Sequence, residues 1–288
     1  MAVTARARAR AKAVRGKVRK ALGRRAARGD VPQLFLVRAP RGPAAAPPLT
    51  REISVATYNV HRWTGHNGRG QPDPARACFV ISELRADVIA LQEVLRPFAG
   101  DDPLESLADR LGLHVAFAAT RTHRLGELGN AILSRGPIGG VFVLDLSYSR
   151  MERRLAMAAQ LPYAGGVLDI VATHLALGAR TRHRQVRSLL DHPRLQGAPT
   201  LLLGDLNAWR RCKATRALDD ELAFHGKPWP ASFPAARPVL ALDRIYSRGI
   251  RILGVGTHTS AAARRASDHL PVVARVELPI SLAEPTAS

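Results

Sequence analysis

The chain has 288 residues, 46% of them hydrophobic, which suits one substantial folded domain and leaves little room for a second. Its net charge is +20, but residues 1–50 hold thirteen Lys or Arg against the single acid Asp30, so +12 lies there and +8 in the rest. Two cysteines without metal-type spacing argue against a disulfide framework and a zinc-cysteine site. We expect no secretory signal, because no sufficiently long apolar stretch follows the early charges.

Residues 1–50 are predicted to form a basic tail rich in Ala, Arg and Pro. Ala alternates with Arg over residues 5–10, and a Pro/Ala stretch runs from Pro40 to Pro48. Ala and Arg favour helix, but the segment lacks the apolar stripe that packs a helix on a core, so we predict a solvated, disordered extension. Two functional interpretations remain: a tether to nucleic acid or an anionic membrane surface, and an organellar transit peptide.

From residue 51 onward, strand-like and helix-like segments alternate. The predicted strands are Ile53–Val60, Val88–Leu91, Ala131–Leu133, Val141–Leu146, Leu155–Leu161, Val167–Ala172, Thr200–Leu203, Leu242–Tyr246 and Val272–Glu277. The predicted helices are Pro74–Leu84, Leu104–Leu111 and Arg180–Leu190. Several strands follow one another without a helix, so a mixed α/β sandwich fits better than a wholly parallel doubly wound sheet. The folded domain is predicted over residues 51–277, with a C-terminal tail at residues 278–288.

Polar side chains stand at the ends of several predicted strands. Asn59 ends the first strand, Glu93 ends the second, and His174 follows a later one. Asp205 and Asn207 follow another buried strand. Residues at the same ends of neighbouring strands meet at one rim of a sheet, so we expect these side chains to converge. Each of them alone is also an ordinary way to end a strand.

Near its C-terminus the chain reads Ser267-Asp268-His269-Leu270-Pro271. An Asp beside a His places an oxygen ligand for a hard cation next to a group that transfers protons. Alone, such a pair before a proline is equally an ordinary turn. Together with the polar strand ends, it favours a metal-dependent phosphoesterase.

Seven motifs, in this order, resemble those of the endonuclease/exonuclease/phosphatase superfamily. They are Thr57-Tyr58-Asn59-Val60-His61, Leu91-Gln92-Glu93-Val94, Gly129-Asn130-Ala131-Ile132-Leu133-Ser134-Arg135, Thr173-His174-Leu175, Gly204-Asp205-Leu206-Asn207, Leu242-Asp243-Arg244-Ile245-Tyr246 and Ser267-Asp268-His269-Leu270-Pro271. The superfamily includes deoxyribonucleases of the pancreatic type, abasic-site endonucleases, inositol-polyphosphate phosphatases and neutral sphingomyelinases. The resemblance spans about residues 51–277 and implies its fold, a two-sheet mixed α/β sandwich flanked by helices.

The resemblance also implies an ion site. Carried over by position, it makes Glu93 the principal ligand of Mg²⁺, with Mn²⁺ as a substitute ion, assisted by Asn59 and Asp268. All three offer oxygen, which a hard divalent cation requires. Asp205 and Asn207 are implied to hold the attacking water or a second ion, with Asp205 as the favoured base.

Two histidines are implied to flank the scissile phosphate. Of His174 and His269, one would stabilise the charge on the phosphate and the other would move a proton, while Asp243 would orient His269. The implied reaction is in-line attack of water on phosphorus. Which group acts as base and which as acid stays open.

Further residues are expected to contact the substrate. The amide of Asn130 is expected to contact a phosphate oxygen, and Arg154 to add a charged fork to the same group. Trp209 follows Asn207-Ala208 and is predicted to wall the pocket, and so is the segment Ala231–Pro234.

The predicted function is therefore Mg²⁺-dependent hydrolysis of a phosphodiester, with nucleic acid as the favoured substrate because of the basic tail. The alternative substrate is a phospholipid headgroup or small phosphate ester, with the tail as a tether to an anionic membrane. The third hypothesis is a non-catalytic binding protein on the same fold. Loss of an acidic ligand would favour it, and all four acids of the motifs are present. We expect a monomeric, cytoplasmic protein.

Overall fold

A computed structural model describes residues 35–41, 47–148, 153–197, 199–226 and 228–280. Residues 1–34 and 281–288 lie outside the described residues, and with them most of the predicted basic tail and most of the predicted C-terminal tail. The two sheets and the candidate site are formed by described residues.

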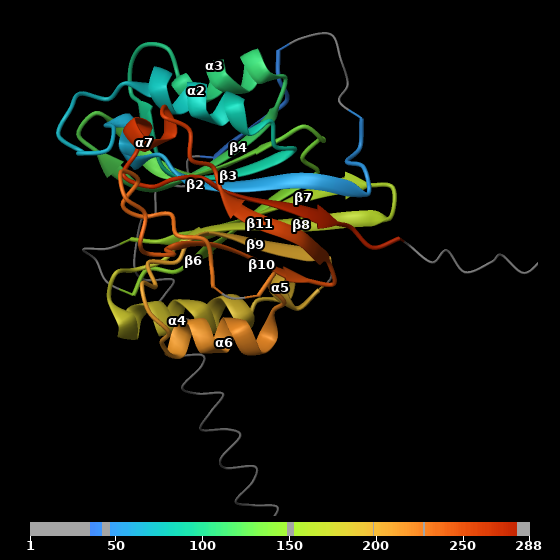
Figure 1. Cartoon of the computed structure of the whole chain (residues 1–288). Coiled ribbons are helices and arrows are strands. Elements are labelled where there is room, and N and C mark those ends of the chain that lie inside the picture. The colour runs from blue at the N-terminus through green and yellow to red at the C-terminus, as the bar shows by residue number, and fades with distance from the viewer. Residues whose placement is uncertain (1–34, 42–46, 149–152, 198, 227, 281–288) are drawn as a thin grey trace, which may run out of the picture. The chain divides into compact units, whose positions relative to one another are not determined.

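Two sheets form the centre of the fold (Figure 1). The seven-stranded sheet has the order β1 (Phe35–Arg38), β4 (His114–His123), β5 (Gly126–Ser134), β3 (Val88–Pro97), β2 (Glu52–Asn59), β12 (Val272–Glu277) and β11 (Arg251–Thr257). The five-stranded sheet has the order β10 (Asp243–Arg248), β9 (Thr200–Asp205), β8 (Gly166–His174), β7 (Leu155–Tyr163) and β6 (Gly140–Asp145). The pairs β2–β3 and β8–β9 are parallel, and the other pairs are antiparallel. The predicted mixed two-sheet sandwich is confirmed.

The space between the two sheets is filled with apolar side chains. Val55 and Ile132 from the seven-stranded sheet and Met157, Leu168 and Leu203 from the five-stranded sheet are fully buried there. Successive side chains of a strand point to opposite faces, so each strand also buries a second set on its outer face. Strands buried on both faces read as continuous apolar runs, which is why they were predictable from the sequence.

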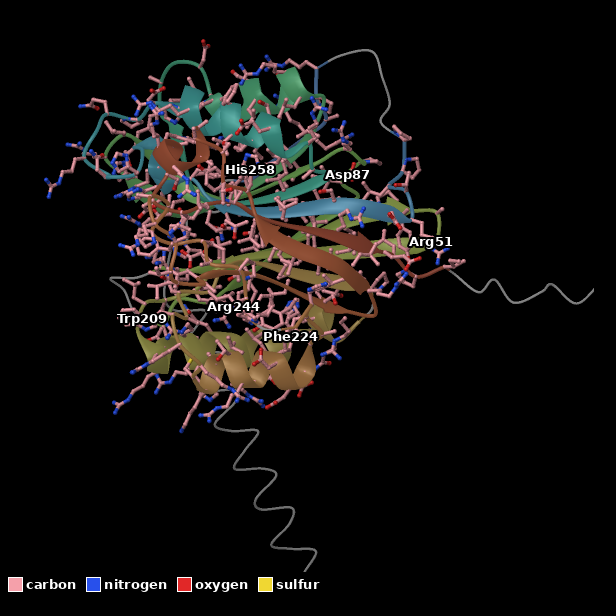
Figure 2. All side chains as sticks on the ribbon, in the orientation of Figure 1. Arg51, Asp87, Trp209, Phe224, Arg244 and His258 are labelled. Carbon is pink, nitrogen blue, oxygen red and sulfur yellow. The ribbon has the colours of Figure 1, made fainter. Side chains whose placement is uncertain are left out.

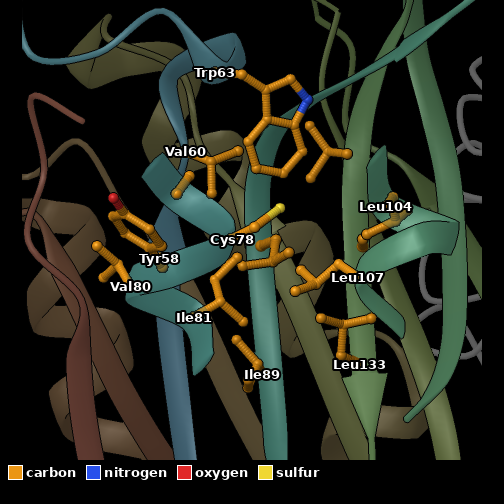
Figure 3. Packing of buried hydrophobic residues seen from close by; sticks show 14 of the residues in the cluster. Tyr58, Val60, Trp63, Cys78, Val80, Ile81, Ile89, Leu104, Leu107 and Leu133 are labelled. Atoms are coloured by element: carbon orange, nitrogen blue, oxygen red, sulfur yellow. The ribbon is translucent and has the colours of Figure 1, made fainter. Parts of the chain in front are cut away.

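Helices cover the outer faces of both sheets. On the seven-stranded sheet lie α2 (Pro74–Leu84), α3 (Pro103–Leu111), α7 (Ala263–Ala266) and the short η1 (His61–Trp63), which share a core with it (Figure 3). On the five-stranded sheet lie α4 (Ala179–Leu190), α5 (Pro193–Gln196) and α6 (Lys213–Glu221). Among the described residues, no helix combines the length and apolar character that a bilayer crossing requires.

The two predicted helices on this first face begin at Asp-Pro pairs. The Asp73 carboxylate accepts a hydrogen bond from the backbone of α2, and the Asp102 carboxylate does the same for α3. The proline that follows each Asp fits the first helical turn, where its missing N–H leaves no partner unsatisfied. These caps explain why the sequence predicted where both helices start to within one residue.

The folded domain begins earlier than residue 51, where the sequence placed its start. Strand β1 pairs with β4 inside the region predicted as tail. Arg38 at its end donates to Asp109 at 2.7 and 2.9 Å and to Glu105 at 2.9 Å, both on α3. Counting charge along the sequence assigned Arg38 to the basic tail, whereas its ion pairs bind it to the domain.

Candidate active site

Strand ends from both sheets open into one cavity of about 530 Å³. Its lining residues are Asn59, His61, Glu93, Arg154, His174, Leu177, Asp205, Asn207, Trp209, Phe233, Leu240, Leu242, Asp268 and His269. Nine of the eleven predicted site residues are among them. Strand register explains part of this convergence, because His174 on β8 and Asp243 on β10 both pair with Asp205 on β9.

The Asp205 carboxylate lies at the centre of the buried polar groups. Its Oδ2 accepts a hydrogen bond from Asn59 Nδ2 at 3.1 Å, and lies 3.4 Å from His174 Nε2 and 3.6 Å from His269 Nε2. Its Oδ1 accepts from the backbone N–H of Asn207 at 2.9 Å. Asp205 lines the cavity although it is only 1% exposed, and these neighbours fix its orientation.

Asp243 lies behind His269 and does not line the cavity. Asp243 Oδ2 accepts a hydrogen bond from His269 Nδ1 at 2.8 Å, which leaves His269 Nε2 directed at Asp205. The Ser232 hydroxyl donates to the same Asp243 oxygen at 2.6 Å. The Phe233 ring lies 5.0 Å from the His269 ring and is tilted by 53° against it. The predicted pairing of Asp243 with His269 is therefore present, with Ser232 as an additional member.

The two histidines differ in charge. Burial and the charge of Arg154 lower the pKa of His174 to about 3, and Asp205 offsets this only in part. Burial also lowers the pKa of His269, but the negative charges of Asp243 and Asp205 outweigh that effect and raise it to about 10. At neutral pH the cavity thus holds one neutral imidazole and one imidazolium.

The three predicted ion ligands line the same cavity, and each has a polar partner. Asn59 Oδ1 accepts from the backbone N–H of His61 at 3.0 Å. Asp268 Oδ1 lies 3.2 Å from His61 Nδ1, and Glu93 Oε2 lies 3.4 Å from Arg62 Nε. Glu93 stands at a break in the register between β3 and β5, with a φ of 53°. Two carboxylates and an amide oxygen form a donor set that fits a hard divalent cation.

A second cluster with potential metal ligands consists of Asp205, Asp243 and His269, whose ligand atoms lie within 4.8 Å of one another. The short contact between His269 Nδ1 and Asp243 Oδ2 is a hydrogen bond, and Ser232 occupies the same oxygen. Asp243 is fully buried and away from the cavity. In this cluster Asp243 thus has its Oδ2 already engaged, whereas Asn59, Glu93 and Asp268 offer oxygen atoms to the cavity.

The predicted substrate contacts have different outcomes. Arg154 lies in the cavity wall. Trp209, labelled in Figure 2, also lines the cavity and is 66% exposed. The segment Ala231–Pro234, which was predicted to wall the pocket, contributes Phe233 to the cavity lining. Asn130 is buried on β5, where its amide donates to the Leu155 carbonyl oxygen at 3.4 Å, so the structure does not bring it to the cavity.

Sequence reasoning gave no role to two polar groups of the site, Ser232 and His61, although Ser232 lies in the predicted pocket segment. Ser232 carries no signal of its own, because its partner Asp243 follows eleven residues later. His61 belongs to the first motif, but its approach to Asp268 depends on a backbone turn after β2. Both roles follow from tertiary contacts that no local pattern contains.

The sequence profile of the Endonuclease/Exonuclease/phosphatase family matches residues 56–269. The chain belongs to this family. Its members are, as a rule, hydrolytic phosphoesterases. The match covers most of the chain and contains every predicted site residue, so the predicted membership is confirmed.

Several known proteins are similar to this chain at different levels of sequence identity. Uncharacterized protein YbhP of Escherichia coli K12 is 29% identical over 262 residues, which cover 81% of this chain and 100% of YbhP. An endonuclease/exonuclease/phosphatase from Beutenbergia cavernae is 25% identical with a TM-score of 0.64, covering 79% of this chain and 72% of that one. D. rerio TDP2 complexed with a single-strand DNA product is 17% identical with a TM-score of 0.60, covering 78% and 99%, and at this identity shows the shared fold alone.

Proposed function

We propose that this chain is a phosphodiesterase that depends on a divalent cation, with Mg²⁺ as the ion and nucleic acid as the substrate. One observation carries the proposal. The Asp205 carboxylate is held by Asn59 beside two imidazoles, in a cavity that Glu93 and Asp268 also line. This arrangement supplies a base, proton donors and oxygen ligands within one site.

The proposed ion ligands are Asn59, Glu93 and Asp268. A bound divalent cation would offset the negative charge that develops on the phosphoryl oxygens. The cavity wall supplies Arg154 as a further positive group for the same phosphate, and its charge already acts on the neighbouring His174.

The protein's own groups account for the proton transfers. Asp205 takes a proton from the attacking water, whose oxygen forms the new bond to phosphorus as the bond to the leaving oxygen breaks. His269 faces the cavity through Nε2 because Asp243 holds Nδ1, and it donates the proton that the leaving oxygen requires. His174 donates a hydrogen bond to a non-bridging oxygen. Asn207 keeps Asp205 oriented through its backbone N–H.

The rim of the cavity favours nucleic acid. Trp209 is exposed at the cavity, and the next two residues, Arg210 and Arg211, are exposed as well. Bases stack on exposed aromatic faces, while arginines bind the phosphates between them. The same fold carries a single-strand DNA product in D. rerio TDP2.

The test is hydrolysis of labelled single-stranded DNA, duplex DNA and RNA by the full chain with Mg²⁺. We expect cleavage that EDTA stops and that Asp205→Asn lowers by about 10²–10⁴-fold, because the base is lost. Asp220→Asn, an exposed Asp on α6, is the matched control and should cleave like the wild type. Binding of the ion without cleavage of any oligonucleotide would contradict the proposed substrate.

A second candidate, hydrolysis of a phospholipid headgroup, is favoured by the apolar side chains at the rim. Leu177 lines the cavity and is 72% exposed, and Val239 beside the lining residue Leu240 is 67% exposed. Exposed apolar side chains next to arginines also suit an anionic membrane surface. Release of water-soluble phosphate from anionic vesicles, with no cleavage of oligonucleotides, would select this substrate instead.

A further inference from the structure

One turn of the backbone touches all three proposed ion ligands. Directly after β2, the backbone N–H of His61 donates to Asn59 Oδ1 at 3.0 Å. The His61 ring lies 3.2 Å from Asp268, and the Arg62 guanidinium lies 3.4 Å from Glu93. These ligands come from the end of β2, from the register break inside β3, where the sequence had placed the strand's end, and from the loop before β12, so the turn connects groups that are far apart in the sequence.

The turn has an unfavourable backbone conformation. His61, Arg62 and Trp63 have φ values of 46°, 57° and 65°, in the left-handed region that side chains with a Cβ rarely adopt. The buried Trp63 ring fixes the turn, because its Nε1 donates to the Leu95 carbonyl oxygen at 2.7 Å. The Trp63 carbonyl oxygen accepts from the backbone N–H of Asp73 at 2.7 Å. Such strain persists only where the surrounding structure enforces it, and it is common at functional sites.

Arg62 is held at Glu93 by charge. Its Nε lies 3.4 Å from the carboxylate, and this atom is buried without a hydrogen-bond acceptor among the residues that the structure describes. The other end of the guanidinium contacts His61 Nε2 at 2.8 Å. A guanidinium placed in this way offsets the charge of the Glu93 carboxylate without a hydrogen bond from Nε. A metal cation can therefore take the place of the guanidinium at Glu93 more easily than it could replace a hydrogen-bonded partner.

We propose that the His61-Arg62 turn is a positioning element of the ion site, and that Arg62 weakens ion binding by pairing with Glu93. The inference rests on the proposed ion site at Asn59, Glu93 and Asp268. In the absence of the ion, the positive charge of Arg62 offsets the negative charge of the Glu93 carboxylate. An entering cation competes for that carboxylate and is repelled by the guanidinium. The negative phosphate of the substrate then restores the charge balance, which couples tight ion binding to substrate binding.

The experiment titrates Mn²⁺ into the full chain by calorimetry and follows thermal unfolding with and without the ion. Arg62→Asn removes the charge and keeps a residue that tolerates positive φ, whereas Arg62→Lys keeps the charge. Because the pair is partly exposed, we expect Arg62→Asn to bind Mn²⁺ about two- to fivefold more tightly. It should also unfold at a lower temperature without the ion. Arg62→Lys should stay close to the wild type in both measurements.

Unchanged or weaker Mn²⁺ binding in Arg62→Asn would overturn the role of Arg62. Arg62→Gly, which adopts the left-handed conformation freely, is the second neutral variant and should show the same tighter binding. Glu93→Gln identifies the site and should abolish binding in the wild-type and Arg62→Asn backgrounds. If the wild type binds no Mn²⁺, the proposed ion site itself is wrong and the role of Arg62 falls with it. If Glu93→Gln abolishes binding while both neutral variants match the wild type, only the role of Arg62 is wrong.

Discussion

The half of the cavity proposed to transfer protons and the half proposed to bind the ion are built on different kinds of backbone. Asp205, His174 and Asp243 lie at the ends of regular strands, and the register of β8, β9 and β10 places them side by side. In the other half, Glu93 stands at a break in strand register, and its partner Arg62 stands in a left-handed turn.

The difference extends to burial and bonding. Asp205, Asp243 and His269 are buried and joined by a hydrogen bond or close contacts, which fix the orientation of the side chains. Glu93 and Asp268 are partly exposed and paired with cationic or imidazole groups. The comparison teaches that the proposed proton-transfer groups hold one another in a buried network, while the carboxylates of the proposed ion site, Glu93 and Asp268, keep partners that another cation can replace.

The largest expected effect tests the rigid half. Asp243→Asn keeps the size of the side chain but removes the charge that holds His269 Nδ1–H. We expect kcat to fall about 10²–10⁴-fold with little change in KM, because the imidazole loses its orientation and its proton. Steady-state kinetics measure this, with Asp220→Asn as the control. A kcat near that of the wild type would show that the charge of Asp243 is not needed to orient or protonate His269.

The next effect tests what holds the turn at the ion ligands. Trp63→Ala removes a buried ring that donates to Leu95, and we expect it to lower the free energy of unfolding by about 3–5 kcal/mol. Trp209→Ala, at an exposed tryptophan, should leave it nearly unchanged. Denaturant unfolding of both variants makes the measurement. Equal losses would contradict the assignment of Trp63 to the core and of Trp209 to the rim.

A smaller effect concerns the rim, outside both halves. Trp209→Ala should weaken binding of single-stranded oligonucleotide by about 1–3 kcal/mol per stacked base, with kcat little changed. Trp209→Phe keeps an aromatic face and should recover most of the loss. Fluorescence anisotropy with Asp205→Asn protein measures binding without cleavage. If the Phe variant binds as weakly as the Ala variant, stacking on this side chain is not the interaction.

The smallest expected effect is a change in thermal stability at an ion pair far from the cavity. It serves as a reference, because it should not alter the activity of either half. Hydrogen bonds from Arg38 and from the backbone N–H of Arg41 lower the pKa of Asp109 to about 2, from an ordinary value of about 4. Because the pKa of Asp109 is lower in the folded than in the unfolded chain, the ionised carboxylate stabilises the fold at any pH above the unfolded pKa. This contribution is present above about pH 4 and disappears as the pH falls towards 2. Arg38→Gln should therefore lower the melting temperature at pH 7 and converge with the wild type near pH 2. Activity per folded molecule should not change.

Local sequence signals predicted several elements closely. The helix Pro74–Leu84 and the strand Val272–Glu277 have the predicted bounds, because an Asp-Pro cap starts the first and an alternating apolar pattern marks the second. The strands β1, β4 and β11 were not predicted. Strand β11 contains Gly254 and Gly256, which weaken a strand pattern in the sequence. Its hydrogen bonds to β12 stabilise the strand where the intrinsic propensity of its residues does not.

The sequence by itself determined the chemistry available to this protein. The residue types in seven ordered motifs predicted the family, the two-sheet fold and nine of the residues that line the cavity. Residue type and order suffice for this because polar residues such as Asn59, His174 and Asp205 interrupt an apolar strand pattern at the strand's end.

Only the tertiary structure decided which of these groups meet. It joins Asn59 to Asp205 across 146 positions, directs the His61-Arg62 turn at the proposed ion ligands, and leaves Asn130 in the core. Strand order, register and left-handed backbone depend on contacts between distant segments, which no local pattern specifies.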